Sequence, residues 1–347
     1  MNKTSPALLV SILLGVFLLE IHGAPLLAVQ DEHFQFNLDV GTAYTDNLFL
    51  EPSPSMRRDY ATVARFRGRF EPDSAGTWWH ELKYRFRLYD WHLDHQASSW
   101  DHDLKWNAFK RFSHRFSGLV KNYTCWNQAR FEADSYVNNR TDAGFMFRTG
   151  QDTYGGLFYW HELRHFRRNN SRERSSDAGE LLFRWALSGN RGFEFAYDYE
   201  LRQYKYLLAG ANRRRDVIDR FRVSYSQVFN FDTTAKIELW YRFFNSNDTY
   251  WEYDNPRLTM FIWHELRRQQ LITLYGYLES RYYPNRAVTG SAKKQKDLVL
   301  YAATKFRHRL GLDTYLEALY TFLKDNSNSD PFDYTHNKYE LRFGVEF

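Results

Sequence analysis

The feature that most limits the fold of this chain is a period of two in its apolar residues, which runs from about residue 33 to the C-terminus. A period of two places apolar side chains on one face of a β-strand and polar side chains on the other. The last run shows it most clearly, with Tyr339, Leu341, Phe343, Val345 and Phe347 alternating with Glu340, Arg342, Gly344 and Glu346. The pattern recurs at 36–44, 82–88, 193–202, 217–225 and 235–243. The sequence therefore predicts an all-β chain.

Composition indicates where such strands lie. Aromatic residues make up 19% of the chain, yet its mean hydropathy is −0.66. After residue 30 no segment offers the roughly 18 uninterrupted apolar residues of a membrane-spanning helix. If this chain is a membrane protein, it therefore crosses the membrane with strands. Lipid-facing and lumen-facing residues alternate in a transmembrane barrel, which reconciles many aromatics with a polar average.

Counting the alternating runs predicts a barrel of about sixteen strands, an even number as in bacterial outer-membrane barrels. The runs are centred near residues 39, 65, 84, 105, 120, 144, 158, 183, 198, 221, 238, 261, 276, 301, 318 and 342. The faces near 120, 158 and 261 stay undecided.

The connections alternate between short and long. Short turns are expected at 73–76, 150–151, 189–190, 230–231, 268–269 and 311, and long polar loops at 45–59, 91–98, 130–138, 167–176, 210–215, 245–251, 284–296 and 324–335. We expect an antiparallel up-and-down transmembrane barrel with short periplasmic turns, longer extracellular loops and both chain ends in the periplasm.

The first thirty residues have the pattern of a secretory signal peptide. Lys3 supplies a positive charge, Leu8–Leu19 is an apolar stretch too short for a confident span, and the small residues Ala24 and Ala28 follow. We therefore expect a signal peptide at 1–30 and one outer-membrane barrel domain at 31–347. The single cysteine, Cys125, excludes an internal disulfide and a cysteine-based zinc site, and no cofactor is expected.

Two local patterns resemble known outer-membrane proteins. The terminal aromatic Phe347, inside its alternating run, resembles the C-terminal strand that the barrel-assembly machinery of Gram-negative bacteria reads. The segment 41–49, Gly-Thr-Ala-Tyr-Thr-Asp-Asn-Leu-Phe, resembles the Y-x-D-N-x-F opening of β-barrel porins, including those found beside exopolysaccharide systems. The resemblance implies an outer-membrane location, the assembly machinery as a partner, and a porin-like or polymer-export role.

His161-Glu162-Leu163-Arg164-His165 matches the H-E-x-x-H motif of zinc proteases. That chemistry needs a helix that places both histidines on one face, whereas this run alternates like a strand. The string Trp-His-Glu-Leu also occurs at 79–82 and 263–266. Its recurrence favours an aromatic girdle at the membrane edge over a metal site, so no catalytic or metal-binding residue is assigned. A second candidate, a barrel-wall enzyme, would use His92, His95, His102 and Asp101.

The strongest candidates for a function in solute passage are charged residues on the polar face of the strands. Two basic rows are expected to face the lumen, Arg65, Arg67 and Arg69 on one strand and Lys83, Arg85 and Arg87 on the next. They either attract anions or form a salt-bridge lattice with Asp39, Asp101 and Asp103. Glu194, Asp198 and Glu200 are expected to form an acidic wall.

These patterns predict a porin-like channel for small or anionic solutes and not an enzyme. The loop at 45–59, with Pro52 and Pro54, is a candidate constriction. Polymer export, a barrel-wall enzyme, and a structural barrel filled by groups such as Trp240, Tyr275 and Tyr277 stay open as alternative functions.

Expected partners are outer-membrane lipid and lipopolysaccharide, whose phosphates suit the basic loops around 167–174 and 213–215 better than nucleic acid does. The oligomeric state is left open.

Overall fold

The computed structural model describes residues 33–52, 55–72, 77–129, 135–167, 172–188, 190–207, 213–230, 232–329 and 332–347. The expected signal peptide at 1–30 lies outside the described residues. No helix among them is long and apolar enough to cross a membrane. Two short 3-10 turns lie in the connections at the long-loop rim, η1 (His95–Ala97) and η4 (Thr249–Trp251).

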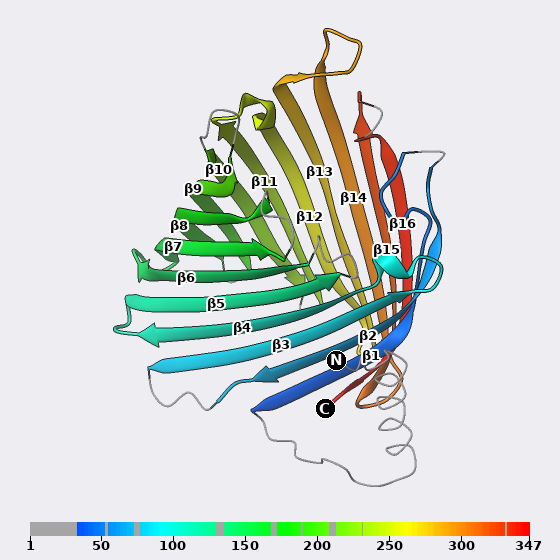
Figure 1. Ribbon diagram of the computed structural model, residues 1–347. Coiled ribbons are helices and arrows are strands. Elements are labelled where there is room, and N and C mark those ends of the chain that lie inside the picture. Colours follow the sequence, from blue (N-terminus) through cyan, green and yellow to red (C-terminus); the bar gives the residue numbers. More distant parts are fainter. Residues whose placement is uncertain are drawn as a thin grey trace.

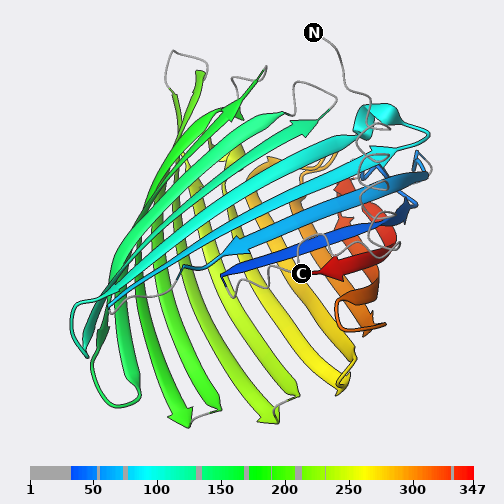
Figure 2. The same ribbon diagram turned by 90° about the horizontal axis from the view of Figure 1, so that it is seen from below.

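The described residues form sixteen antiparallel strands that close into one barrel (Figures 1 and 2). The strands are β1 (Phe34–Thr45), β2 (Asp59–Phe70), β3 (Trp78–Trp91), β4 (Ser99–Arg111), β5 (Phe116–Ala129), β6 (Tyr136–Arg148), β7 (Thr153–Phe166), β8 (Arg174–Ser188), β9 (Arg191–Leu207), β10 (Arg213–Asn230), β11 (Thr233–Ser246), β12 (Tyr253–Arg267), β13 (Gln270–Ala287), β14 (Lys294–Arg309), β15 (Thr314–Ser327) and β16 (Tyr334–Glu346). Each strand pairs with its neighbours in sequence, and β1 pairs with β16. The predicted up-and-down barrel is confirmed, and each predicted strand centre lies in its own strand.

The polarity of the barrel is inverted relative to a soluble protein. Large apolar side chains such as Leu181, Phe183 and Trp185 are exposed on the outer face, whereas charged side chains such as Asp39 and Arg342 are buried. The alternation produces this directly, because successive side chains of a strand point to opposite faces. An apolar outside and a polar inside, with no free sheet edge, are what a hydrocarbon environment requires.

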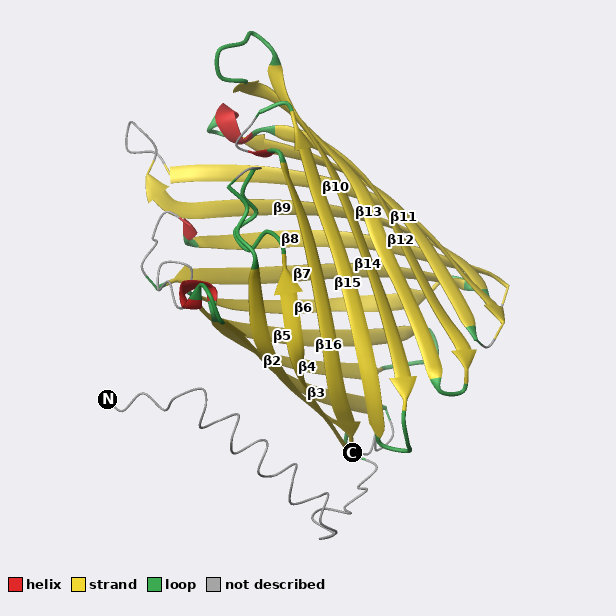
Figure 3. Cartoon of the chain, turned by 90° about the vertical axis from the view of Figure 1, so that its right-hand side faces the viewer, coloured by secondary structure: helices red, strands yellow, loops and turns green. Residues whose placement is uncertain are grey.

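The connections sort by length between the two rims. Longer connections such as 92–98 and 247–252 lie at one rim, and shorter ones such as 268–269 and 310–313 lie at the other; the expected turns at 73–76, 189–190 and 230–231 lie wholly or partly outside the described residues. The hairpin of β13 and β14 rises above the rest of the long-loop rim (Figure 1). The C-terminus lies at the short-turn rim (Figure 3). This is the predicted alternation of short and long connections.

The seam between β1 and β16 is closed by a buried network in addition to its backbone ladder. Arg342 on β16 is 2% exposed, and its guanidinium lies 2.5 Å from Glu317 on β15, 3.4 Å from Glu340 and 3.7 Å from Asp39 on β1. Gly41 stands opposite Arg342, where a Cβ would collide with the backbone of β16. The arginine therefore joins three carboxylates across the point of closure.

Candidate functional site

Both predicted basic rows lie on the inner face of the barrel, side by side. The register pairs Arg65 with Arg87, Arg67 with Arg85 and Arg69 with Lys83. Arg65 on β2 reaches across β1 to Glu340 on β16, 2.9 Å away. Side chains from strands that are not neighbours meet only on the concave side of a barrel wall, so these rows face its interior.

Every member of the two rows has a carboxylate partner. Arg67 lies 3.0 Å from Asp39, Arg85 pairs with Asp103, and Nε of Arg87 donates to Asp101 at 2.9 Å. These are the three partners that the sequence suggested. Glu81 lies 2.7 Å from both Arg69 and Lys83, and Glu340 pairs with Arg65. The geometry is therefore that of the salt-bridge lattice, with most of the basic charge compensated.

The three acidic residues expected to form a separate wall are also engaged. Glu194 lies 2.5 Å from Arg184 of β8, Glu200 lies 2.8 Å from Arg202, and Asp198 lies 3.7 Å from Arg220. They share the inner face of β9 with basic neighbours on both sides. The structure thus does not bring them together as an uncompensated acidic surface.

A second basic cluster, which sequence reasoning did not select, lines a cavity of about 560 Å³ on the inner face of β10–β13. Five basic side chains surround it with one acid, Glu238: Arg220, Arg222, Lys236, Arg242 and Arg257. The inner face is fixed by Arg222 of β10, which lies 3.7 Å from Glu180 of β8, across β9. The alternation Arg220–Arg222 was visible in the sequence, but the grouping with Arg242 and Arg257 depends on the register of two hairpins, β10–β11 and β11–β12.

Trp240 sits at the centre of this cluster. Its ring centroid lies 4.7 Å from the guanidinium carbon of Arg242, 5.0 Å from that of Arg257 and 5.8 Å from that of Arg220. Arginine stacks well on aromatic faces, so the indole holds like charges near one another. Trp240, Tyr275 and Tyr277 face the interior as the sequence suggested, here as one wall of the cavity region.

Another cavity, of about 860 Å³, lies near the short-turn rim. Its lining includes members of the paired basic rows together with Lys105 of β4, whose ammonium lies 5.1 Å from the ring centroid of Tyr123. Among the described residues no ion pair involves Lys105. It is an inner-face cation on the opposite wall from Trp240.

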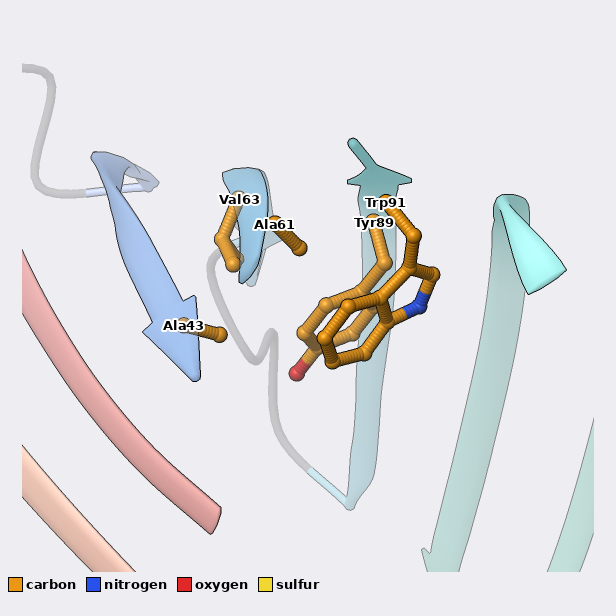
Figure 4. Close-up of a cluster of buried hydrophobic side chains, with 5 residues drawn as sticks. All are labelled: Ala43, Ala61, Val63, Tyr89 and Trp91. Atoms are coloured by element: carbon orange, nitrogen blue, oxygen red, sulfur yellow. The ribbon is translucent and has the colours of Figure 1, made fainter. Parts of the chain in front are cut away.

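The described residues of the connection between β1 and β2, 46–52 and 55–58, pack inward through Leu48. Leu48 contacts a buried apolar cluster at the long-loop end of β1–β3, formed by Ala43, Ala61, Val63, Tyr89 and Trp91 (Figure 4). Asn47 is fully buried, and its side-chain amide donates to the carbonyl oxygens of Glu51 and Thr335. Arg57 lies 3.5 Å from Asp94 of the next loop. The described part of this loop is therefore tied to the barrel wall on both sides; Pro54 lies outside the described residues.

The H-E-x-x-H motif does not assemble a metal site. It lies on β7, where Glu162 points inward toward Arg174, 3.4 Å away, and both histidines point outward. His161 pairs with Asp177 at 2.8 Å and His165 with Glu173 at 2.5 Å. Residues four apart on a strand are about 13 Å apart, too far to share one ion. Among the described residues no group of His, Cys, Asp or Glu is arranged to hold a metal.

The girdle interpretation of Trp-His-Glu-Leu is wrong for its tryptophans. Trp79 donates from Nε1 to Glu71 and shares the inner face of β3 with Glu81 and Lys83, whereas Leu82 faces outward. Trp160 is 6% exposed and stacks under Arg140, 4.2 Å from its guanidinium carbon. The physical reason is that the period of two places Trp with Glu and not with Leu.

The proposed barrel-wall site is also not formed. His102 faces outward and bonds the hydroxyl of Tyr84, whereas Asp101 faces inward toward Arg87. His92 lies 3.0 Å from the hydroxyl of Thr62. Adjacent residues of one strand cannot converge on one substrate, because they occupy opposite faces.

No protein-family model matches this chain, and no curated protein matches it. Solved structures share its fold. OpdQ of Pseudomonas aeruginosa superposes with a TM-score of 0.52 at 7% identity, covering 91% of this chain and 98% of OpdQ. A loop-deletion mutant of the outer-membrane protein OmpT of Vibrio cholerae gives 0.50 at 9% identity, covering 90% and 99%. CdiB of Acinetobacter baumannii gives 0.51 at 11% identity, covering 91% of this chain and 60% of CdiB.

At these identities the likeness concerns the fold. It agrees with the sixteen closed strands and with an outer face that only lipid would cover favourably. The chain therefore has the porin-like fold of the bacterial outer-membrane β-barrels, consistent with a location in the outer membrane.

Proposed function

We propose that this protein is a porin-like channel that lets small solutes, anions in preference, cross the outer membrane. The observation that carries the proposal is the inner face, which is lined by charged and polar side chains and holds the cavity of about 560 Å³, with the cavity of about 860 Å³ at the short-turn rim. A barrel of sixteen strands is wide enough to enclose water unless loops fill it.

Anion preference rests on the second basic cluster rather than on the predicted rows. The rows of β2 and β3 are compensated at short range, whereas the cavity of β10–β13 has five basic side chains and one acid in its lining. A positive wall beside low-dielectric material raises the local concentration of anions. Leu48, in the connection between β1 and β2, packs on the inner face at the long-loop end of β1–β3, which supports a constriction on that side.

A channel agrees with the chemistry better than the enzyme alternatives. The two H-E-x-x-H histidines lie four residues apart on the outer face, and Asp101 and His102 point to opposite faces, so neither group converges on one substrate or metal ion. A polymer-export role rests on the resemblance of segment 41–49 alone.

The test is single-channel recording of the refolded barrel in a planar bilayer, with a salt gradient across it. We expect a steady conductance and a reversal potential whose sign shows that anions pass more readily than cations. Folded protein that never conducts would refute the channel, and a cation-selective reversal potential would refute the anion preference. Arg222→Gln should shift the reversal potential toward zero. Arg184→Gln, also on the inner face but paired at 2.5 Å with Glu194, should shift it less.

A further inference from the structure

Lys236 lies 2.9 Å from Glu238, but the arginines around Trp240 are less closely paired with carboxylates than the two predicted basic rows are. Arg220 lies 3.7 and 3.8 Å from Asp198 and Glu200, and Arg222 lies 3.5 Å from Glu194. Among the described residues Arg242 has no carboxylate within ion-pair distance; its guanidinium donates to the hydroxyl of Tyr253 at 3.3 Å. These are long distances beside the 2.7–3.0 Å of the predicted rows.

The acids that border the cluster bind other arginines more closely. Glu194 is nearer to Arg184, at 2.5 Å, and Glu200 is nearer to Arg202, at 2.8 Å. Glu279 lies 2.6 Å from Arg281 but 3.4 Å from Arg257 of the cluster. These carboxylates therefore neutralise arginines around the cluster more than they neutralise the arginines that contact Trp240, so the centre of the cluster keeps a positive charge.

The guanidinium groups are also preorganised. Arg257 lies 3.7 Å from the ring centroid of Tyr277 and donates to the hydroxyl of Tyr275 at 2.9 Å. With Trp240 between them, Arg220, Arg242 and Arg257 keep fixed positions around one cavity without using all of their donors on carboxylates. An oxyanion that entered would meet donors already in place.

We propose that the cavity around Trp240 is a binding subsite for the phosphate group of a small phosphorylated sugar. A phosphate monoester carries about two negative charges and three acceptor oxygens near neutral pH, which suits several arginines converging on one point. A carboxylate offers one charge and two oxygens, enough for a single guanidinium fork. The rings of Phe261 and Tyr275, which belong to the lining, would contact the apolar face of the sugar ring. A cavity of about 560 Å³ is within the size range of small-ligand sites.

This subsite deepens the proposed channel, since a solute passing through the lumen would reach it, but its test does not depend on conduction. Binding of D-glucose 6-phosphate to the detergent-purified full barrel is measured by isothermal titration calorimetry, with D-glucose and D-glucuronate as comparison probes. Arg242→Gln removes one donor of the cluster. Lys105→Gln removes the same charge from the opposite wall and is the matched control.

We expect glucose 6-phosphate to bind, glucose not to bind, and Arg242→Gln to weaken binding about tenfold or more, since one hydrogen bond to a charged group is worth about that factor. Lys105→Gln should change the affinity less than about twofold at moderate ionic strength, because a charge on the far wall is largely screened. Arg242→Lys, which keeps the charge and loses the planar fork, should fall between them and serves if Arg242→Gln does not fold.

Three results would overturn the assignment. Equal affinities for glucose and glucose 6-phosphate would show that the phosphate group does not contribute to binding. Equal binding of glucuronate would remove the preference for phosphate, and equal losses in Arg242→Gln and Lys105→Gln would remove the location. A barrel that binds but does not conduct would refute only the channel, and one that conducts without binding would refute only the subsite.

Discussion

The ring of Tyr315 packs over the backbone of Gly344 beside the closing seam, and this contact can be tested quantitatively. Tyr315 of β15 is 1% exposed, stands opposite Gly344 of β16 in the register, and donates from its hydroxyl to Asn37 of β1 at 2.7 Å. Its ring lies where a side chain of residue 344 would be, and an added Cβ would be only 2.7 Å from Cε1 of the ring. Residue 344 is therefore a glycine because the ring of Tyr315 fills the space that a Cβ would need.

Gly344→Ala should destabilise the barrel by about 2 kcal/mol. Overpacking a filled site costs about 1–3 kcal/mol, and losing the hydrogen bond to Asn37 costs about 1 kcal/mol. The reduced chain entropy of alanine in the unfolded state returns at most about 1 kcal/mol.

The assay is reversible urea unfolding of the barrel in lipid vesicles, followed by tryptophan fluorescence. Gly68→Ala on the outer face is the matched control, because a Cβ there would make an ordinary 3.5 Å contact with Phe36. In a Tyr315→Ala background the cost of Gly344→Ala should vanish. The reasoning fails if Gly344→Ala is no more costly than Gly68→Ala, or equally costly with and without the tyrosine ring.

Three further predictions concern the interior and the motif. Arg342→Gln leaves buried carboxylates without their cation and should cost about 3–5 kcal/mol in the same unfolding assay; a loss below about 1 kcal/mol would contradict the buried network. Leu48→Ala should loosen the inward loop and increase current noise in single-channel records, whereas Leu93→Ala, 74% exposed in the neighbouring loop, should not; equal noise in both would argue against an anchor. Zinc content measured by atomic absorption after dialysis should be the same in the wild type and in the double variant His161→Ala, His165→Ala, and a drop in the variant would show a site that the strand geometry does not form.

Most of the fold could be predicted from the sequence because the side-chain period of a strand is two and a bilayer penalises error on the outer face. All sixteen strand positions and the alternation of loop lengths follow from that. Where the pattern was mixed, the sequence was silent. On the outer face, the side-chain amide of Asn122 on β5 donates to the hydroxyl of Thr141 on β6 at 2.9 Å. On β7 the aromatic Trp160 faces inward. The polarity of a side chain alone therefore gives the wrong face at these positions.

The candidate site was only half predictable. Local alternation correctly placed Arg65–Arg69 and Lys83–Arg87 on one face, and the nearby partners Asp101 and Asp103 followed from strand order. Glu340, which pairs with Arg65, lies at the other end of the chain and comes near only when β16 closes against β1. The compensation of the rows therefore could not be weighed before closure.

By itself the sequence determined the class of fold, the number of strands and which residues face inward on most of them, since these depend on local periodicity. Only the tertiary structure decided which inward charges are neutralised. That outcome depends on the register of neighbouring strands and on closure of the barrel, which bring Arg220, Arg242 and Arg257 around Trp240 and leave their nearest acids bound to other arginines. Electrostatic compensation acts over a few ångströms in space, and sequence separation does not report that distance.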